Sequence, residues 1–145
     1  MQLVTMIPFG AIAQETATVT PTEGFLDNYD AEMEFVIDSI EDWYAVANAT
    51  DKTFEGKTVK LGADIDGNNT ETPVLFQIFK GTFDGQEKTV KNMTVTGDAL
   101  IARNVTKGTI KNLKVENVHL TCNAKVTNVT GEANVASNEG YGIIC

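Results

Sequence analysis

Cysteine and histidine are scarce in this chain. The two cysteines, Cys122 and Cys145, are too few for a disulfide scaffold and have no metal-ligand spacing. We interpret both as buried free thiols, with a bridge between them as the alternative. The one histidine, His119, alternates with apolar neighbours on a predicted strand, which favours a structural role over catalysis. No HExxH, GxSxG, phosphate-loop or Cys-x-x-Cys motif is present, so these common enzyme and metal classes are excluded.

Long apolar runs are also missing. The uncharged start contains "LVTMIPFGAIA", residues 3–13, which ends in the small-residue pattern of a signal-peptide cleavage site but lacks a basic beginning. We interpret residues 1–14 as a partial signal peptide, with an apolar first strand as the alternative. Because the run is shorter than the ~20 residues of a spanning helix, no membrane span is predicted.

Basic residues are absent from a long N-terminal stretch. Residues 15–42 hold nine acidic side chains and no Lys or Arg, whereas residues 43–145 hold eleven of each sign. The net charge of -9 therefore comes from one segment. We predict an acidic disordered spacer over 15–34 and a neutral folded domain over 35–145. This balance argues against nucleic acid as a partner.

One short segment has the periodicity of an amphipathic helix. In "SIEDWYAVANAT", residues 39–50, apolar side chains recur at helical spacing, including Trp43 and Tyr44. Ser39 with Asp42 three residues later resembles a capping box. The pattern predicts a helix over 39–50 that lays Trp43 and Tyr44 over the first turn of the fold that follows.

The rest of the chain repeats itself. "KTVKNMTVTGDAL", residues 88–100, is nearly copied in "GTIKNLKVENVHL", residues 108–120. The period of twenty residues indicates a solenoid. Strand-forming residues change faces between Asn92 and Met93, so each repeat reads as strand, corner, strand. We therefore predict an all-β parallel β-helix of about 20 residues per coil, capped by the N-terminal helix.

That period predicts which side chains stack. Val90 is expected over Ile110, and Met93 over Leu113. A second column is expected to run through Val95, Val115 and Val135. The corner residues Asn92 and Asn112 are expected to stack, with their amides hydrogen-bonded along the column.

The order of these parts resembles a known family. "FVIDSIEDWYAVANATDKTFEGKTVKLGADID", "FKGTFDGQEKTVKNMTV" and "GTIKNLKVENV" are similar to the right-handed β-helical repeats of bacterial surface proteins with GLUG motifs, over roughly residues 35–145. The signature is degenerate, with "ALIA" at 99–102 and "GIIC" at 142–145 where Gly-Leu-x-Gly belongs. The resemblance implies a secreted or surface-attached, adhesin-like protein without catalytic residues in its repeats.

Two acidic residues resemble the beginning of a calcium loop. "DIDGNN", residues 64–69, starts like an EF-hand but has Asn69 and Leu75 where Gly and Glu are required. Asp64 and Asp66 are thus interpreted as turn and cap carboxylates, with a weak calcium site as the alternative. No other cofactor is predicted.

Basic residues gather between positions 88 and 125. Seven are present against two acidic residues, and Lys91 and Lys111 are expected on one outer face. One interpretation is a stripe for an anionic glycan, formed by Lys88, Lys91, Lys107, Lys111 and Lys114. The alternative is a solvated face whose charges discourage aggregation.

Two functions remain open. The first is a noncatalytic secreted or cell-surface module, adhesin-like or a spacer, with a glycan or a host or cell-surface protein as partner. The second is a fragment of a polysaccharide-active β-helix enzyme. Since "GYGIIC", residues 140–145, offers no polar cap, we also expect that the domain is truncated at this end, or that its last coil is covered by a following domain or by end-to-end association with another copy.

Overall fold

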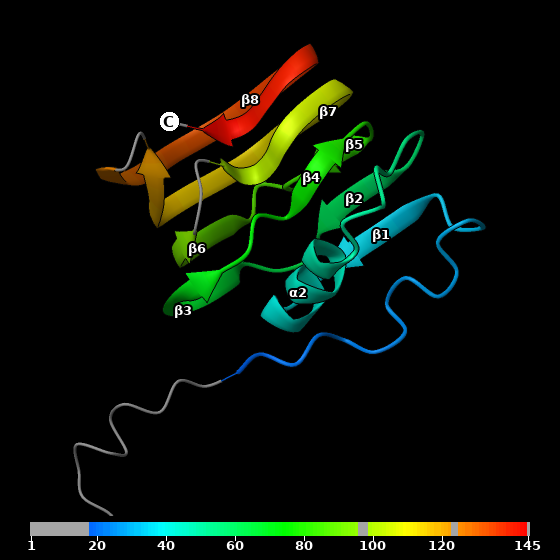
Figure 1. Ribbon diagram of the computed structural model, residues 1–145, viewed down its shortest axis with the longest axis horizontal. Helices are drawn as coiled ribbons and strands as arrows, with labels where there is room; N and C mark the ends of the chain where they lie inside the picture. The colour runs from blue at the N-terminus through cyan, green and yellow to red at the C-terminus, as the bar shows by residue number, and fades with distance from the viewer. Residues whose placement is uncertain (1–17, 96–98, 123–124, 145) are drawn as a thin grey trace, which may run out of the picture.

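The computed structural model describes residues 18–95, 99–122 and 125–144, and their side chains as far as Leu120. The predicted partial signal peptide, 1–14, lies outside this part. The described chain is mostly strand, arranged in one curled, largely parallel sheet with one helix, as Figure 1 shows. The predicted all-β class with parallel pairing is confirmed at this level. The elements are β1 (Glu34–Ile37), α2 (Ile40–Asn48), β2 (Thr58–Leu61), β3 (Ile65–Thr72), β4 (Phe76–Phe79), β5 (Thr82–Asp84), β6 (Thr89–Val95), β7 (Ala99–Cys122) and β8 (Lys125–Ile144).

Successive strands pair as in a solenoid. Face one contains β1, β2, β5 and residues 109–111 of β7, paired in that order. Face two contains β3, β6 and residues 114–120 of β7. Face three contains β4 and residues 102–105 of β7. The chain visits the faces in the order one, two, three and then returns to face one beside its earlier strand.

The pairing offset corrects the predicted period of about 20 residues. Val90 pairs with Val115, twenty-five residues later, and not with Ile110. Ile110 pairs instead with Phe83, twenty-seven residues earlier. Met93 pairs with Val118 and not with Leu113, and Val95 with Leu120. The repeated pentapeptides lie at different corners of the solenoid, so the period of twenty does not measure one coil.

The residue that the pentapeptides share explains the error. Asn92 and Asn112 both have φ of 54°, in the left-handed region, and so does Asn117 with φ of 51°. Asparagine tolerates this conformation better than most residues. The predicted bend after Asn92 is therefore confirmed, but its near-copy at Asn112 bends between faces one and two, one corner earlier in the coil.

Side-chain amides do connect the coils at these corners, with partners other than those predicted. The Asn117 Nδ2 donates to Asn92 Oδ1 at 2.9 Å, and the Asn92 Nδ2 donates to Asp66 Oδ1 at 3.1 Å. In the other column the Asn112 Nδ2 donates to Asp84 Oδ1 at 3.0 Å. Asn92 and Asn112 thus belong to two separate ladders.

Close approach of the coils also explains a glycine between β5 and β6. A Cβ atom built on Gly85 would lie 2.5 Å from the carbonyl oxygen of Asn112 and 2.6 Å from the Cα of Leu113. The backbone of the next coil therefore occupies the space that a side chain at position 85 would need. The glycine keeps the two corners in register.

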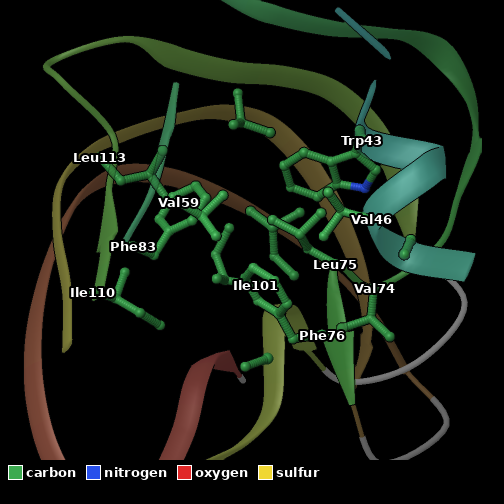
Figure 2. Close-up of a cluster of buried hydrophobic side chains, with 14 of the residues drawn as sticks. Trp43, Val46, Val59, Val74, Leu75, Phe76, Phe83, Ile101, Ile110 and Leu113 are labelled. Atoms are coloured by element: carbon green, nitrogen blue, oxygen red, sulfur yellow. The ribbon is translucent and has the colours of Figure 1, made fainter. Parts of the chain in front are cut away.

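Apolar side chains of all three faces meet in one core. Figure 2 shows Val59 and Phe83 of face one beside Ile101 and Phe76, with Trp43 and Val46 of α2 entering from the other side. The predicted helix is confirmed, with Ser39 as N-cap accepting a hydrogen bond from the Asp42 N–H at 3.2 Å. Trp43 is fully buried, and its Nε1 donates to the Pro73 carbonyl at 2.9 Å.

The prediction of a disordered spacer over 15–34 is wrong from about Pro21 onward. Residues 23–31 form turns, and Phe25, Leu26 and Tyr29 pack against the core. The Tyr29 ring lies 5.8 Å from that of Phe35 and 5.1 Å from that of Phe54. Three apolar side chains within five residues outweigh the charge repulsion on which the prediction rested.

The acidic residues of this region also have partners. Asp42 accepts hydrogen bonds from the Thr22 hydroxyl at 2.6 Å and from the Asp38 N–H at 2.9 Å. The ammonium groups of Lys52 and Lys57 each lie 4.9 Å from the centre of the Tyr29 ring. Basic residues from beyond position 42 thus approach the acidic segment. A count of charges within each segment of the sequence does not reveal these contacts.

The last strand reverses direction. β8 pairs antiparallel with β7 along most of its length, with Val115 opposite Gly131 and Ile110 opposite Val135. The predicted parallel stacking of Val135 on Val115 is therefore wrong. In Figure 1, β8 lies beyond β7, at the opposite end of the sheet from β1 and α2. It covers the edge of β7 that a further parallel coil would otherwise occupy.

Candidate functional site

The five lysines of the predicted anionic-ligand stripe divide between two faces and the corners. Lys111 lies on face one, where Asp84 is its cross-strand partner, whereas Lys91 lies on face two between Asp66 and Glu116. The expectation that Lys91 and Lys111 share one face is wrong. Lys88 and Lys114 lie at the start of face two, and Lys107 lies exposed at a corner with φ of 57°.

Acidic groups accompany several of these lysines. The Lys111 Nζ lies 3.6 Å from Asp84 Oδ2, and the Lys114 Nζ lies 3.4 Å from Glu87 Oε2. On face one, Lys60 pairs in the same way with Glu34 at 2.6 Å. Such exposed pairs add little stability, but in each pair the carboxylate offsets the positive charge of the lysine beside it. The lysines therefore do not form one continuous cationic surface.

Asp66 is a turn acceptor, as the favoured interpretation predicts, whereas Asp64 accepts a hydrogen bond from the next coil. Asp64 Oδ1 accepts from the Thr89 N–H at 2.8 Å, and Asp66 Oδ1 accepts from the Asn68 N–H at the same distance. That backbone hydrogen bond, followed by the one from the Asn92 amide, lowers the pKa of Asp66. Within residues 18–95 and 99–120, no group of three or more potential ligands is placed to hold a metal ion.

Among the side chains that the structure describes, two carboxylates are buried, and both form hydrogen bonds inside the fold. Asp42 is 8% exposed and lies at the start of α2, bound to Thr22 and Asp38. Asp84 is 7% exposed and accepts hydrogen bonds from the Gln86 N–H and the Asn112 amide, each at 3.0 Å. Burial alone would raise the pKa of Asp84, but these hydrogen bonds lower it below its ordinary value. Both carboxylates are thus engaged by hydrogen bonds within the fold.

A groove lies between α2 and face three. It has a volume of about 440 Å³. Its floor is formed by the buried Thr72 and Val74. Its walls combine one aromatic ring, two amides and one charge of each sign, and they are formed by Tyr44, Asn48, Glu71, Pro73, Gln77 and Arg103.

Hydrogen bonds from the helix fix the shape of the groove. The Tyr44 hydroxyl donates to the Glu71 carbonyl at 2.7 Å, and the Trp43 indole donates to the Pro73 carbonyl. Burial, and then the Glu71 carboxylate, raise the pKa of Tyr44 above its ordinary value. Two residues of α2 thereby hold the connection from β3 to β4 in place.

Sequence reasoning missed this groove. Gln77 of β4 and Arg103 of β7 lie between the cross-strand pairs Phe76–Ala102 and Ile78–Asn104. They are twenty-six positions apart in the chain, and the expected coil of twenty residues would not place them side by side. For Tyr44 the helical pattern favours the core over a ligand platform, whereas its side chain is half-buried and lines the groove.

His119 is placed on face two, opposite Thr94, and the predicted strand position is confirmed. The predicted states of Cys122 and Cys145 depend on side chains outside the described part of the chain.

No family model matches the sequence, and neither a curated protein nor a solved structure matches the chain. In the described ranges, no helix is both long enough and apolar enough to span a membrane.

Proposed function

We propose that the chain is a noncatalytic module of a secreted or cell-surface protein, adhesin-like or a spacer, built as a right-handed parallel β-helix similar to GLUG-motif repeats. The parallel strand pairs and the left-handed asparagine corners support a β-helix. Right-handed crossover is the rule for parallel strands. In this β-helix each coil has about 25 residues, as the offsets between paired residues indicate, and not the predicted 20 or so.

The main support for the noncatalytic role is that hydrogen bonds within the fold already occupy the buried carboxylates. Most glycoside hydrolases use two carboxyl groups that flank the bond they cleave. Here the Asp42 carboxylate accepts from the N–H of Asp38, just before α2, and the Asp84 carboxylate accepts from the N–H of Gln86, at the corner after β5. They lie in different elements, and each already accepts backbone hydrogen bonds. The groove contributes a single carboxylate, that of Glu71.

Incubation with a panel of neutral and anionic polysaccharides tests this proposal. We expect no release of reducing ends or unsaturated sugars above a blank without protein. Release of either product by the purified chain, abolished by Glu71→Gln, would overturn the noncatalytic role and favour the polysaccharide-active alternative.

A further inference from the structure

The groove between α2 and face three has the composition of a ligand site. Its volume lies at the lower end of the range of small-molecule pockets, about 300–1,000 Å³. Its polar groups come from three separate elements, α2, the β3–β4 region and β7, and they converge on one hollow. We propose that this groove binds a neutral oligosaccharide. This inference rests on the proposed role of the chain as a noncatalytic surface module.

The functional groups in the groove suit hydroxyl groups. The side-chain amides of Asn48 and Gln77 each offer donors and an acceptor, the Arg103 guanidinium offers only donors, and the Glu71 carboxylate only acceptors. A sugar presents hydroxyl groups that both donate and accept. The half-buried Tyr44 ring supplies the apolar surface that the carbon side of a sugar ring can cover.

Arg103 provides the strongest single interaction available. Its side chain is exposed, and among the side chains that the structure describes, up to Leu120, no carboxylate lies within ion-pair distance of it. A guanidinium already paired with a carboxylate would have fewer free donors. Here it can donate to a ligand through a planar pair of N–H groups.

Charge favours a neutral ligand over an anionic one. The groove contains one cation and one anion, Arg103 and Glu71, and the whole chain carries a net charge of -9. An acidic sugar would gain the attraction of Arg103 but meet the repulsion of Glu71 and of the chain. A neutral sugar uses both groups as hydrogen-bonding partners.

The backbone of the groove disfavours an extended peptide. Peptides that add to a sheet bind through free main-chain groups. The carbonyl groups of Glu71 and Pro73 already accept hydrogen bonds from Tyr44 and Trp43. Side chains are therefore the main contacts that the groove offers to a ligand.

Titration calorimetry of the full chain with cellohexaose, xylohexaose and mannohexaose tests the proposal, with trigalacturonate and a pool of random hexapeptides as comparators. We expect at least one neutral hexaose to bind with an affinity that salt does not change. Arg103→Met should weaken that binding by about tenfold or more, because hydrogen bonds from a charged group are lost. Lys107→Met, which removes an exposed cation of the same strand outside the groove, is the matched control and should leave the affinity unchanged.

Three results would overturn the proposal: no binding of any neutral hexaose at millimolar concentration, equal loss in Arg103→Met and Lys107→Met, or preferential binding of trigalacturonate or of peptides. Mass spectrometry of the incubated hexaose separates this inference from the function on which it rests. A bound and cleaved hexaose would leave the sugar site standing and remove the noncatalytic role.

Discussion

Asparagine has two roles at the corners of this solenoid. At Asn92 the backbone adopts φ of 54°, and the side chain connects Asp66 of one coil with Asn117 of the next. Glycine could adopt the backbone but has no side chain to bond, while most other residues would be strained at this φ. The corner therefore depends on both properties of the same residue.

Substitution at Asn92 can separate these two contributions. Asn92→Ala should lower the free energy of unfolding by about 2 kcal/mol, because it adds backbone strain and removes the amide hydrogen bonds. Asn92→Gly should cost less, since it removes only the hydrogen bonds and keeps the conformation accessible. Urea unfolding of the three proteins measures both values. Equal losses in the two variants would show that the left-handed backbone adds no strain at this corner.

Asp84 should make stability depend on pH. Burial opposes its charge, but hydrogen bonds from the Asn112 amide and Gln86 outweigh burial, and its pKa in the folded chain lies below the ordinary 3.8. The stabilisation is therefore fully present above pH 3.8 and is lost as pH falls through the lower, folded value. Asp84→Asn keeps an acceptor oxygen for both donors and removes the titration.

Thermal unfolding from pH 5 to pH 2 tests this linkage. The unsubstituted chain should lose more stability over that range than Asp84→Asn does. Glu87→Gln, which removes an exposed carboxylate paired with Lys114, serves as control and should follow the unsubstituted chain. Parallel curves for Asp84→Asn and the unsubstituted chain would mean that Asp84 does not contribute to the acid sensitivity.

At the level of elements, α2 was the most predictable part of the fold. Its apolar period, its N-cap and the burial of Trp43 all follow from Ser39 and the nine residues of α2. The coils were less predictable, because their registers join residues about 25 positions apart and depend on the number of residues that each corner takes up. The sequence predicted the bend at Asn92 but did not predict which earlier strand pairs with the strand that contains it. The groove depended on those registers and was therefore missed.

The cap of α2 should be worth a measurable part of the stability. Ser39→Ala removes the acceptor for the Asp42 N–H and should cost about 1 kcal/mol in the free energy of unfolding. Ser39→Thr keeps a hydroxyl acceptor and should restore most of that loss. Chemical unfolding followed by the fluorescence of Trp43, the only tryptophan, reports on this helix directly. An unchanged midpoint for Ser39→Ala would mean that the N-cap does not limit the stability of the chain.

At the level of the whole molecule, the two ends of the sheet are covered by different means. At one end α2 and the turns around Tyr29 pack on the first strands, and the rings of Tyr29, Phe35 and Phe54 continue into the core. At the other end β8 folds back on β7. The first cover buries apolar side chains, while the second satisfies the hydrogen-bonding groups along a strand edge.

Removal of residues 123–145 should therefore expose the edge of β7 and cause self-association. The sequence alone favoured an uncovered last coil, whereas the structure pairs β7 with β8 from residue 99 to 122. Size-exclusion chromatography with light scattering, at several concentrations, should show a mass that rises more steeply with concentration for the shortened chain than for the full one. Trp43 belongs to α2, which lies at the opposite end of the sheet from β8 (Figure 1), so its fluorescence checks that the remaining coils are folded. A folded, shortened chain whose mass is as constant as that of the full chain would show that β8 does not protect this edge.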